Sequence, residues 1–193
     1  IDVNGDSIWY TRNGDIVTMH VTAKIFNNSS DNINMARAAK DIVSDIKSTY
    51  EGKFEWSDNK TYNLKVDMDL KVATSMKDVE NSDHLFVLAD SDSKGARGAT
   101  SMLGGKVMTL ASSDFANNNW LSNNLSYNKT FTATHEFGHA IGLSHSQNPF
   151  NIMKQGGVVH NSNSNQRVIM LQQQNNLNNN LVVDIYNLGL KWR

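Results

Sequence analysis

The sequence predicts a mixed α+β fold, and three patterns along the chain carry this prediction. Residues 16–26 and 62–74 alternate apolar with polar side chains, which is typical of strands that bury one face. Residues 29–50 lie between them and repeat apolar side chains at helical spacing. With 193 residues the chain is long enough for one domain with its own core, and we expect a single domain over residues 1–193.

The first three elements are defined by the side chains that share a face. In each strand every second residue is apolar, and in the helix apolar residues recur every three or four positions. Ser30 or Asp31 can cap the start of this helix with a side-chain oxygen. The expected buried positions are Val17, Met19, Val21, Ala23 and Ile25 in the first strand, Met35, Ala39, Ile42, Ile46 and Tyr50 in the helix, and Leu64, Val66, Met68, Leu70 and Val72 in the second strand.

The second half of the chain continues this mixture of strands and helices. A short apolar run predicts a strand that is buried on both faces. A pair of glycines between two short β patterns then predicts a hairpin, and two helical patterns follow with a loop between them. The expected bounds are 84–90 for the buried strand, 98–103 and 106–111 for the hairpin around Gly104 and Gly105, 129–143 for the first helix, a loop to about residue 170, and a last helix with Leu177, Leu181, Val182, Ile185 and Leu188.

Composition excludes several kinds of site and partner. The chain has no cysteine, which removes disulfides, thiol catalysis and cysteine metal sites. A formal net charge of -1 gives no attraction to nucleic acid or to a membrane surface, and we expect neither partner. No apolar run approaches the roughly 18 residues that a membrane span needs, so we expect no membrane insertion. Because the chain starts at Ile1, we interpret it as a processed product or a piece of a longer chain.

The stretch ATHEFGHAIGLSHSQNPFNIM, residues 133–153, contains a set of side chains suited to a metal. In a helix, His135 and His139 face the same way and can offer two imidazole nitrogens to one ion. Glu136 projects beside the ion, which suits a general base for an attacking water. Gly142 can end the helix in a left-handed turn, after which His145 can return as a third ligand. Three neutral nitrogens and one open position are the ligand set of a catalytic zinc.

The segment HEFGHAIGLSH resembles the extended zinc-binding motif of the metzincin metallopeptidases, and Met153 resembles the methionine of their Met-turn. Ser146, Pro149 and the distance to Met153 resemble the matrixin group in particular. The resemblance implies a metzincin-like α+β fold. Its sheet is expected to be twisted and mostly parallel, with about five strands, an antiparallel edge strand and about three helices. It also implies two subdomains: residues 1–142 with the sheet and the active-site helix, and residues 143–193 with the third ligand, the Met-turn and the last helix.

The same resemblance implies a zinc endopeptidase that hydrolyses extended protein substrates. One catalytic zinc is expected on the three histidines of the motif, with Glu136 as base toward the water and as acid toward the leaving amine. Met153 is expected to form an apolar floor beneath the zinc. The substrate is expected to pair through its backbone with the edge strand. The edge-strand residues are Ala99, Thr100, Ser101, Met102 and Leu103.

The resemblance also bears on partners and origin. We expect a secreted, extracellular monomer from a bacterium, with a proteinaceous inhibitor as a candidate partner. Matrixins usually bind a second, structural zinc through histidines in and before the strand pair. This segment has none, so we expect no structural zinc. Lys154 and Gln155 stand where matrixins commonly have Tyr-Pro, and no tyrosine two residues after the methionine is present to assist the transition state.

Four other signals are weaker, and each has a plainer structural interpretation. His20 is expected on the surface of the first strand, and His84 at the start of its strand is assigned no role. His160 lies in the loop that shapes the substrate pocket of metzincins, but a solvated loop residue is the favoured interpretation. A loop with two aspartates resembles half of a calcium site, although a solvated turn is favoured because the full ligand series is missing. Its residues are Asp90, Asp92 and Gly95.

Two other functions stay open. The same peptidase would be a toxin or effector module if it were cut from a larger secreted polypeptide, and the sequence of the parent polypeptide would distinguish this case. A zinc-binding module without catalysis is the third function. The intact Glu136 argues against it, because every catalytic part is present.

Overall fold

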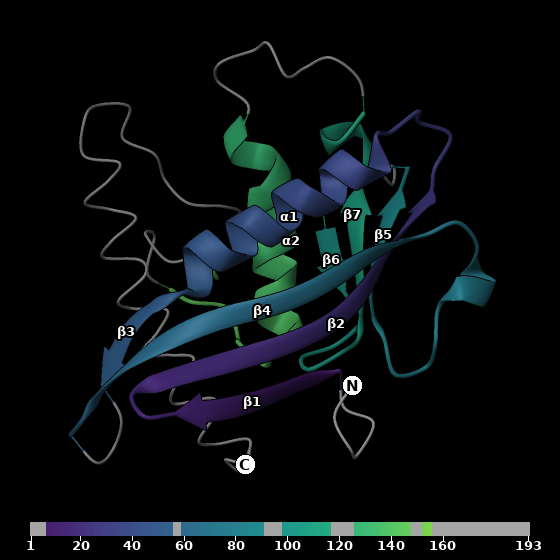
Figure 1. The fold of residues 1–193 in the computed structure, drawn as a ribbon. Coiled ribbons are helices and arrows are strands. Elements are labelled where there is room, and N and C mark those ends of the chain that lie inside the picture. The colour runs from purple at the N-terminus through teal and green to yellow at the C-terminus, as the bar shows by residue number, and fades with distance from the viewer. Residues whose placement is uncertain (1–6, 56–58, 91–97, 117–125, 148–151, 156–193) are drawn as a thin grey trace.

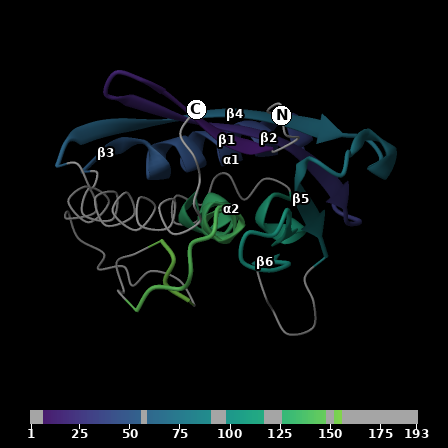
Figure 2. The ribbon, with the colours of Figure 1, turned by 90° about the horizontal axis from the view of Figure 1, so that it is seen from below.

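The computed structural model describes residues 7–55, 59–90, 98–116, 126–147 and 152–155. Seven strands in this part of the chain form one sheet, and two α-helices lie on the same face of it (Figures 1 and 2). The elements are β1 (Ile8–Asn13), β2 (Ile16–Asn28), α1 (Met35–Tyr50), β3 (Gly52–Glu55), β4 (Thr61–Ala73), β5 (His84–Ala89), β6 (Gly98–Thr100), β7 (Val107–Ala111) and α2 (Ser126–Ala140), with short 3-10 helices at Met76–Asp78 and Ser112–Asp114.

The sheet is organised around β2, which pairs with three other strands. Its order is β3-β4-β2-β5-β7-β6, and β1 pairs with β2 beside this path. β4 runs parallel along one edge of β2. The other edge is shared, because β1 pairs antiparallel with the first half of β2 and β5 pairs parallel with the second half. The connection from β2 to the parallel strand β4 requires a crossover, and α1 provides it across the inner face of the sheet (Figure 1).

α1 begins at a side-chain cap and buries one stripe of its surface. The Asn34 side chain accepts a hydrogen bond from the Arg37 N–H at 3.0 Å, which satisfies one of the free amides of the first turn. The helix therefore starts after Asn34 rather than after Ser30 or Asp31. Its buried residues are Ala38, Ala39, Ile42, Ile46 and Tyr50.

The core joins the sheet to both helices. The alternate residues of β2 that the sequence predicted to be buried are all buried, and they form one face of this core. At the end of α1, the Tyr50 ring packs edge-on against Phe137 of α2, with ring centroids 5.6 Å apart. Because Phe137 lies within α2, this packing fixes the position of the helix that carries the histidine motif.

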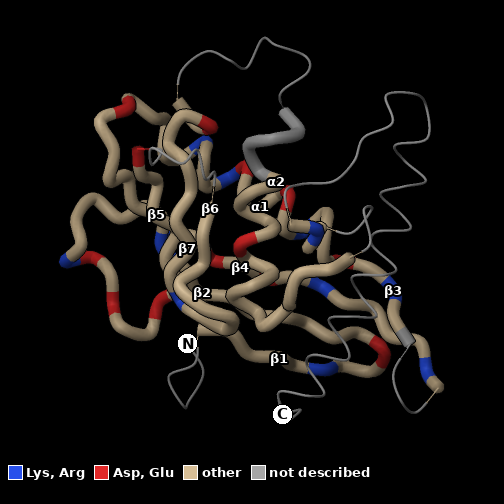
Figure 3. The backbone as a smooth tube through the Cα atoms, turned by 180° about the vertical axis from the view of Figure 1, so that it is seen from behind, with Lys and Arg blue, Asp and Glu red and all other residues tan. Residues whose placement is uncertain are grey.

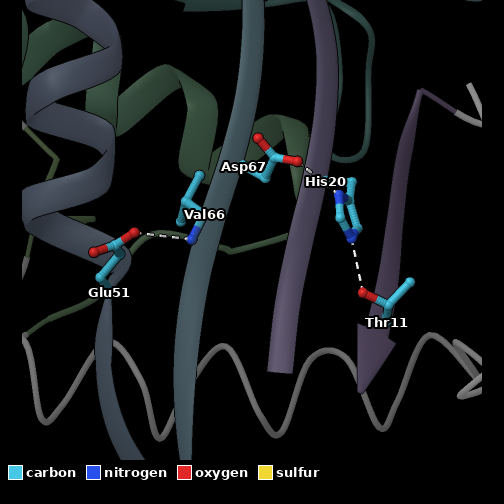
Figure 4. Close-up of polar contacts among 5 residues, drawn as sticks. All are labelled: Thr11, His20, Glu51, Val66 and Asp67. Carbon is cyan, nitrogen blue, oxygen red and sulfur yellow. Dashed lines mark hydrogen bonds and ion pairs between the residues drawn. The ribbon is translucent and has the colours of Figure 1, made fainter. Parts of the chain in front are cut away.

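The outer face of the sheet carries a polar network around His20. The Nδ1 atom of His20 lies 3.0 Å from Asp67 Oδ2, and its Nε2 atom lies 2.7 Å from Thr11 Oγ1 (Figure 4). Trp9 stacks on the same ring, with centroids 5.1 Å apart. The expectation of a surface histidine is therefore only partly right. His20 does lie on the outer face, but neighbours on β1 and β4 cover it and occupy both ring nitrogens.

Charge is spread over the described chain. Lysine and arginine positions are interspersed with aspartate and glutamate positions rather than gathered by sign (Figure 3). Among the helices that the structure describes, none is long and apolar enough to cross a membrane.

The predicted α+β class with a mostly parallel sheet is confirmed. Parallel pairing joins β4, β2, β5 and β7, and β6 is an antiparallel edge strand. The sheet of the described residues has seven strands rather than about five, because β1 and β3 were not predicted: β1 buries only one of its six residues and so shows no clear alternation, and β3 has only four residues. The described residues contain two α-helices rather than about three. The predicted last helix lies outside the described residues and stays a prediction.

Besides the start of α1, the bounds of two further elements differ from the prediction. The helix expected over 129–143 lies at Ser126–Ala140, because a turn at Gly142 ends it before residue 143. The strand expected over 98–103 ends at Thr100, because the following residues are needed for the turn into β7.

Candidate metal centre

α2 places three polar side chains of the motif close together. His135 and His139 are one helical turn apart, and their ring centroids are separated by 4.8 Å. Glu136 follows His135 and is buried, with 6% of its surface exposed. Ala133 and Phe137 are buried at the same i, i+4 spacing and belong to the core. The packing of this apolar stripe therefore sets the direction in which the polar side chains point.

α2 ends in a Schellman turn that depends on Gly142. The Leu143 N–H donates to the Gly138 carbonyl at 2.8 Å, and the Gly142 N–H donates to the His139 carbonyl at 3.0 Å. Gly142 has a φ of 97°, a left-handed conformation that favours glycine. The chain reverses direction here, and the Nε2 atom of His145 comes to 3.1 Å from Nε2 of His139.

The three histidines direct one nitrogen each toward a common point. These ligand atoms all lie within 4.8 Å of one another. The Nδ1 atoms of His135 and His139 each lie 2.7 Å from a main-chain carbonyl, that of Ile152 and that of Leu143 respectively. A carbonyl only accepts hydrogen bonds, so each Nδ1 carries the hydrogen and each Nε2 keeps its lone pair.

This donor set fits zinc. Zinc takes neutral imidazole nitrogens at about 2.0–2.1 Å, which places two nitrogens of a tetrahedral site about 3.3 Å apart. The 3.1 Å between the Nε2 atoms of His139 and His145 is close to that value, whereas separations of up to 4.8 Å within the group must shorten when a zinc binds. The backbone carbonyls that hold the two Nδ1 atoms act as the outer layer that fixes the orientation of metal-binding imidazoles.

Burial changes across the cluster. His135 is buried, His139 is half-buried and His145 is exposed. Burial lowers the pKa of His135, because the imidazolium ion would lose its hydration. The neutral ring is the form that binds a metal. Exposure increases across the cluster from His135 to His145.

Met153 lies under α2, in a space that Gly138 leaves open. A Cβ on Gly138 would overlap the Met153 sulfur and lie 2.8 Å from the Tyr50 hydroxyl oxygen. The Met153 carbonyl accepts a hydrogen bond from the Ser146 N–H at 2.9 Å, so the segment after the third histidine is joined to Met153. The Tyr50 hydroxyl donates to the Thr134 carbonyl at 2.9 Å. α2 is therefore held from below by Met153 and from the side by α1.

The edge of the sheet lies beside Glu136. The Thr100 hydroxyl oxygen on β6 lies 2.7 Å from Glu136 Oε2 and 3.0 Å from the Glu136 carbonyl oxygen. A Cβ on Gly98 would lie 2.9 Å from Glu136 Oε1. In the turn after β6, the Gly104 N–H donates to the His139 carbonyl at 2.8 Å. Both the edge strand and its turn are therefore attached to α2.

Comparison with known proteins supplies a family for this arrangement. A family model described as matrixin matches residues 10–175. The chain belongs to the matrixin family. No curated protein matches the sequence. Among solved structures, the chain is similar to an archaemetzincin from Methanopyrus kandleri, with 14% sequence identity and a TM-score of 0.44 over 87% of this chain and 96% of that chain.

Matrixins are zinc metallopeptidases, and the three-histidine cluster agrees with that chemistry. In this matrixin chain the structure brings together the residues that the motif singled out. His135, His139 and His145 form the cluster, Glu136 lies beside it, and Met153 lies beneath the helix.

The predicted substrate-binding residues of this matrixin divide into two groups. Ala99 and Thr100 lie in β6, whereas Ser101, Met102 and Leu103 lie in the turn that follows and are exposed. A strand that extends to residue 103 is therefore excluded, because the chain must turn toward β7 by then. The Ser101 N–H still donates to the Val107 carbonyl of β7 at 3.0 Å, so the pairing register of β6 and β7 continues one residue beyond β6.

Of the weaker signals, His20 and His84 lie within the described residues, and the aspartate loop falls there only in part. The Asp90 carboxylate lies 3.4 Å from both the N–H and the hydroxyl oxygen of Ser30, which links it to the start of the loop before α1. Asp92, Gly95, Pro149 and His160 lie outside the described residues. The solvated turn favoured for that loop stays a prediction, and a calcium site stays its alternative.

Sequence reasoning missed three residues that support the site. Gly138 interrupts a helical pattern, which often marks close packing, and here it makes room for Met153. Tyr50 places a hydroxyl at the end of an apolar stripe, and a buried tyrosine hydroxyl usually finds an acceptor. Gly98 gave no signal of its own, because its role depends on how β6 meets α2.

Proposed function

We propose that the chain is a zinc endopeptidase in which His135, His139 and His145 hold the zinc. The observation that carries the proposal is the convergence of one nitrogen from each histidine within 4.8 Å, beside a buried Glu136. A structural zinc site is closed by a fourth protein ligand, whereas the group formed by the described residues has three histidines. The arrangement therefore supports a catalytic site with one position left for water or substrate.

Glu136 is the proposed general base and acid. A bound zinc supplies Lewis acidity to the scissile carbonyl and makes the attacking water more acidic. Glu136 accepts a proton from this water as its oxygen bonds to the carbonyl carbon, and it delivers the proton to the leaving nitrogen as the C–N bond breaks. Its burial keeps bulk water away from the carboxylate, and the packing of α2 holds it beside the histidines.

The proposed substrate is an extended peptide that adds to the sheet at β6. β6 is the terminal strand of the order β3-β4-β2-β5-β7-β6, so its outer edge pairs with no strand among the described residues. Backbone pairing at such an edge binds many sequences. Met153 is the proposed apolar floor of the site, which its burial against Gly138 supports.

Peptide cleavage by matched variants tests this proposal. The zinc-loaded chain is offered a peptide library, and Glu136→Ala is expected to lower kcat about 10²- to 10⁴-fold while zinc stays bound. Glu80→Ala is the control, because Glu80 is an exposed glutamate outside the histidine cluster. A chelator should abolish cleavage by the unmodified chain. Full activity of Glu136→Ala would exclude Glu136 as the base, and a zinc-loaded chain that cleaves no peptide would refute the endopeptidase.

A further inference from the structure

The backbone of Thr100 faces the free edge of the sheet. Thr100 lies opposite Met108 in the antiparallel pair of β6 and β7, and the next pair is Ser101 with Val107. Antiparallel pairs alternate between those that exchange hydrogen bonds and those that do not. The Ser101 N–H bonds to the Val107 carbonyl, so the Thr100 pair is of the other kind. The N–H and C=O of Thr100 therefore point away from β7, where a substrate strand would add.

The side chain of Thr100 faces α2. Gly98 and Thr100 lie opposite Leu110 and Met108, which are buried, so they share the inner face of the sheet. The Thr100 hydroxyl oxygen is 2.7 Å from Oε2 of Glu136 and 3.0 Å from its carbonyl oxygen. The hydroxyl has one hydrogen, and the carboxylate is both the nearer and the stronger acceptor.

Gly98 shows independently how closely the strand approaches Glu136. A Cβ at this position would overlap Thr132 Cγ2 and lie 2.9 Å from both Cγ and Oε1 of Glu136. Any side chain at Gly98 would therefore move β6 away from α2 or displace Glu136. One carboxylate oxygen accepts from Thr100, and the other lies against the space that Gly98 leaves open.

We propose that Thr100 is a positioning residue that couples the binding of an extended peptide at β6 to the orientation of Glu136. Its backbone offers the N–H and C=O with which the peptide pairs, and its hydroxyl fixes the carboxylate that handles the proton. When a peptide pairs with the backbone of Thr100, its scissile bond is thus placed relative to the Glu136 carboxylate that the same residue holds. The inference rests on the proposed function, since it assigns a role to Thr100 within that site.

Replacing the hydroxyl by a methyl group of similar size tests the role of Thr100. Thr100→Val is expected to lower kcat about 10- to 100-fold, because a hydrogen bond to a charged group is lost and the base is less well placed. The KM is expected to change by less than about threefold, since the backbone contacts remain. Thr100→Ser keeps the donor and should return kcat to near that of the unmodified chain. Thr109→Val, on the exposed side of β7, is the matched control and should leave kcat unchanged.

Zinc content and the unfolding temperature of each variant separate positioning from damage to the fold. An unchanged kcat in Thr100→Val overturns the proposal. A kcat that is as low in Thr100→Ser as in Thr100→Val also overturns it. An unmodified chain that binds zinc but cleaves no peptide refutes the proposed function instead. In that case crystal structures of the zinc-loaded unmodified chain and Thr100→Val decide the positioning role. A Glu136 carboxylate in the same place in both structures overturns it, and a displaced carboxylate in the variant supports it.

Discussion

At Gly138, α2 packs closely against Tyr50 of α1 and against Met153. Alanine is a better helix former than glycine by about 1 kcal/mol, so Gly138→Ala would stabilise an isolated helix. In the folded chain the added methyl group would overlap Met153 and press on the Tyr50 hydroxyl. Overpacking of this kind costs about 1–3 kcal/mol, and we expect a net decrease in the free energy of unfolding measured in urea.

A double-mutant cycle identifies the contact that causes the loss. Met153→Ala leaves a cavity beneath Gly138, and the double variant should be less destabilised than the sum of the two single variants because the new methyl group partly fills that space. If the losses in free energy of unfolding of the two single variants simply add in the double variant, the destabilisation by Gly138→Ala does not come from its contact with Met153.

His84 makes the stability of the fold depend on pH. It is buried at the start of β5, and its Nδ1 atom lies 2.5 Å from Ser7 Oγ. Burial, with a smaller contribution from Lys106, lowers the pKa of His84 from 6.5 to about 4. The unfolded chain therefore takes up a proton on His84 near pH 6.5, whereas the folded chain does so only near pH 4. Acid favours the unfolded state in this window, and the free energy of unfolding should fall by at most about 3 kcal/mol from this group.

Urea unfolding at a series of pH values measures this dependence. A chelator is added throughout, so that release of zinc from protonated histidines does not contribute. His84→Asn keeps a polar group near Ser7 but does not titrate, and its stability should change less between pH 6.5 and pH 4. The same slope in both chains would assign the dependence to other groups.

The sequence predicts the residues of the histidine motif better than the distant residues that hold the motif in place. His135, Glu136 and His139 are recognisable because helical spacing alone brings them together. The bond from Thr100 to Glu136 joins residues 36 positions apart, and the bond from Tyr50 to Thr134 joins residues 84 positions apart. Such contacts depend on how the strand and helices pack, which no local pattern records.

At the scale of elements, the end of α2 determines where the third histidine lies. Gly142 takes a left-handed conformation, and an alanine there costs about 1–2 kcal/mol. Gly142→Ala should therefore lower stability and also move His145, because the turn that returns the chain is strained. We expect weaker zinc binding, measured by competition with a chromophoric chelator.

Gly14 offers a matched control for this prediction. It also has a positive φ, of 60°, and a Cβ there would meet no atom within 4 Å. It lies in the turn between β1 and β2, which carries none of the clustered histidines. Gly14→Ala should lower stability by a similar amount and leave zinc affinity unchanged. Equal losses of zinc affinity in the two variants would show that strain at Gly142 does not act through His145.

Among the elements, the long periodic segments are all predicted, whereas the short strands are predicted unevenly: β5 and β7 are found, β1 and β3 are missed and β6 is predicted too long. α1, β2 and β4 each offer 13 or more residues of one pattern. β3 has four residues and β6 has three, so their existence depends on pairing with β4 and β7. β6 is predicted too long because Met102 and Leu103 are apolar and look like strand residues. In the structure they lie in the exposed turn.

At the scale of the molecule, three distant parts of the chain converge on one place. α2 brings two histidines and Glu136, the turn at Gly142 brings the third histidine, and β6 brings Thr100. The sheet and α1 hold these parts in position through the core around Tyr50 and Phe137. A ligand that joins two of these parts should therefore stabilise the whole fold rather than one loop.

The folded chain is accordingly expected to bind one zinc and to be stabilised by it. A ligand that binds only the folded state raises the free energy of unfolding by about 2.7 kcal/mol when its free concentration is 100 times Kd. Thermal unfolding in zinc buffers should thus show a Tm that rises with free zinc, and metal analysis should give one zinc per chain. His139→Ala should abolish both effects, because it removes one of the three ligands of the cluster.

His20→Ala is the matched control, since His20 lies in the network on the outer face of the sheet and should leave the zinc dependence intact. A second zinc that persists in His139→Ala would contradict the expectation of a single site and would place another site elsewhere in the chain.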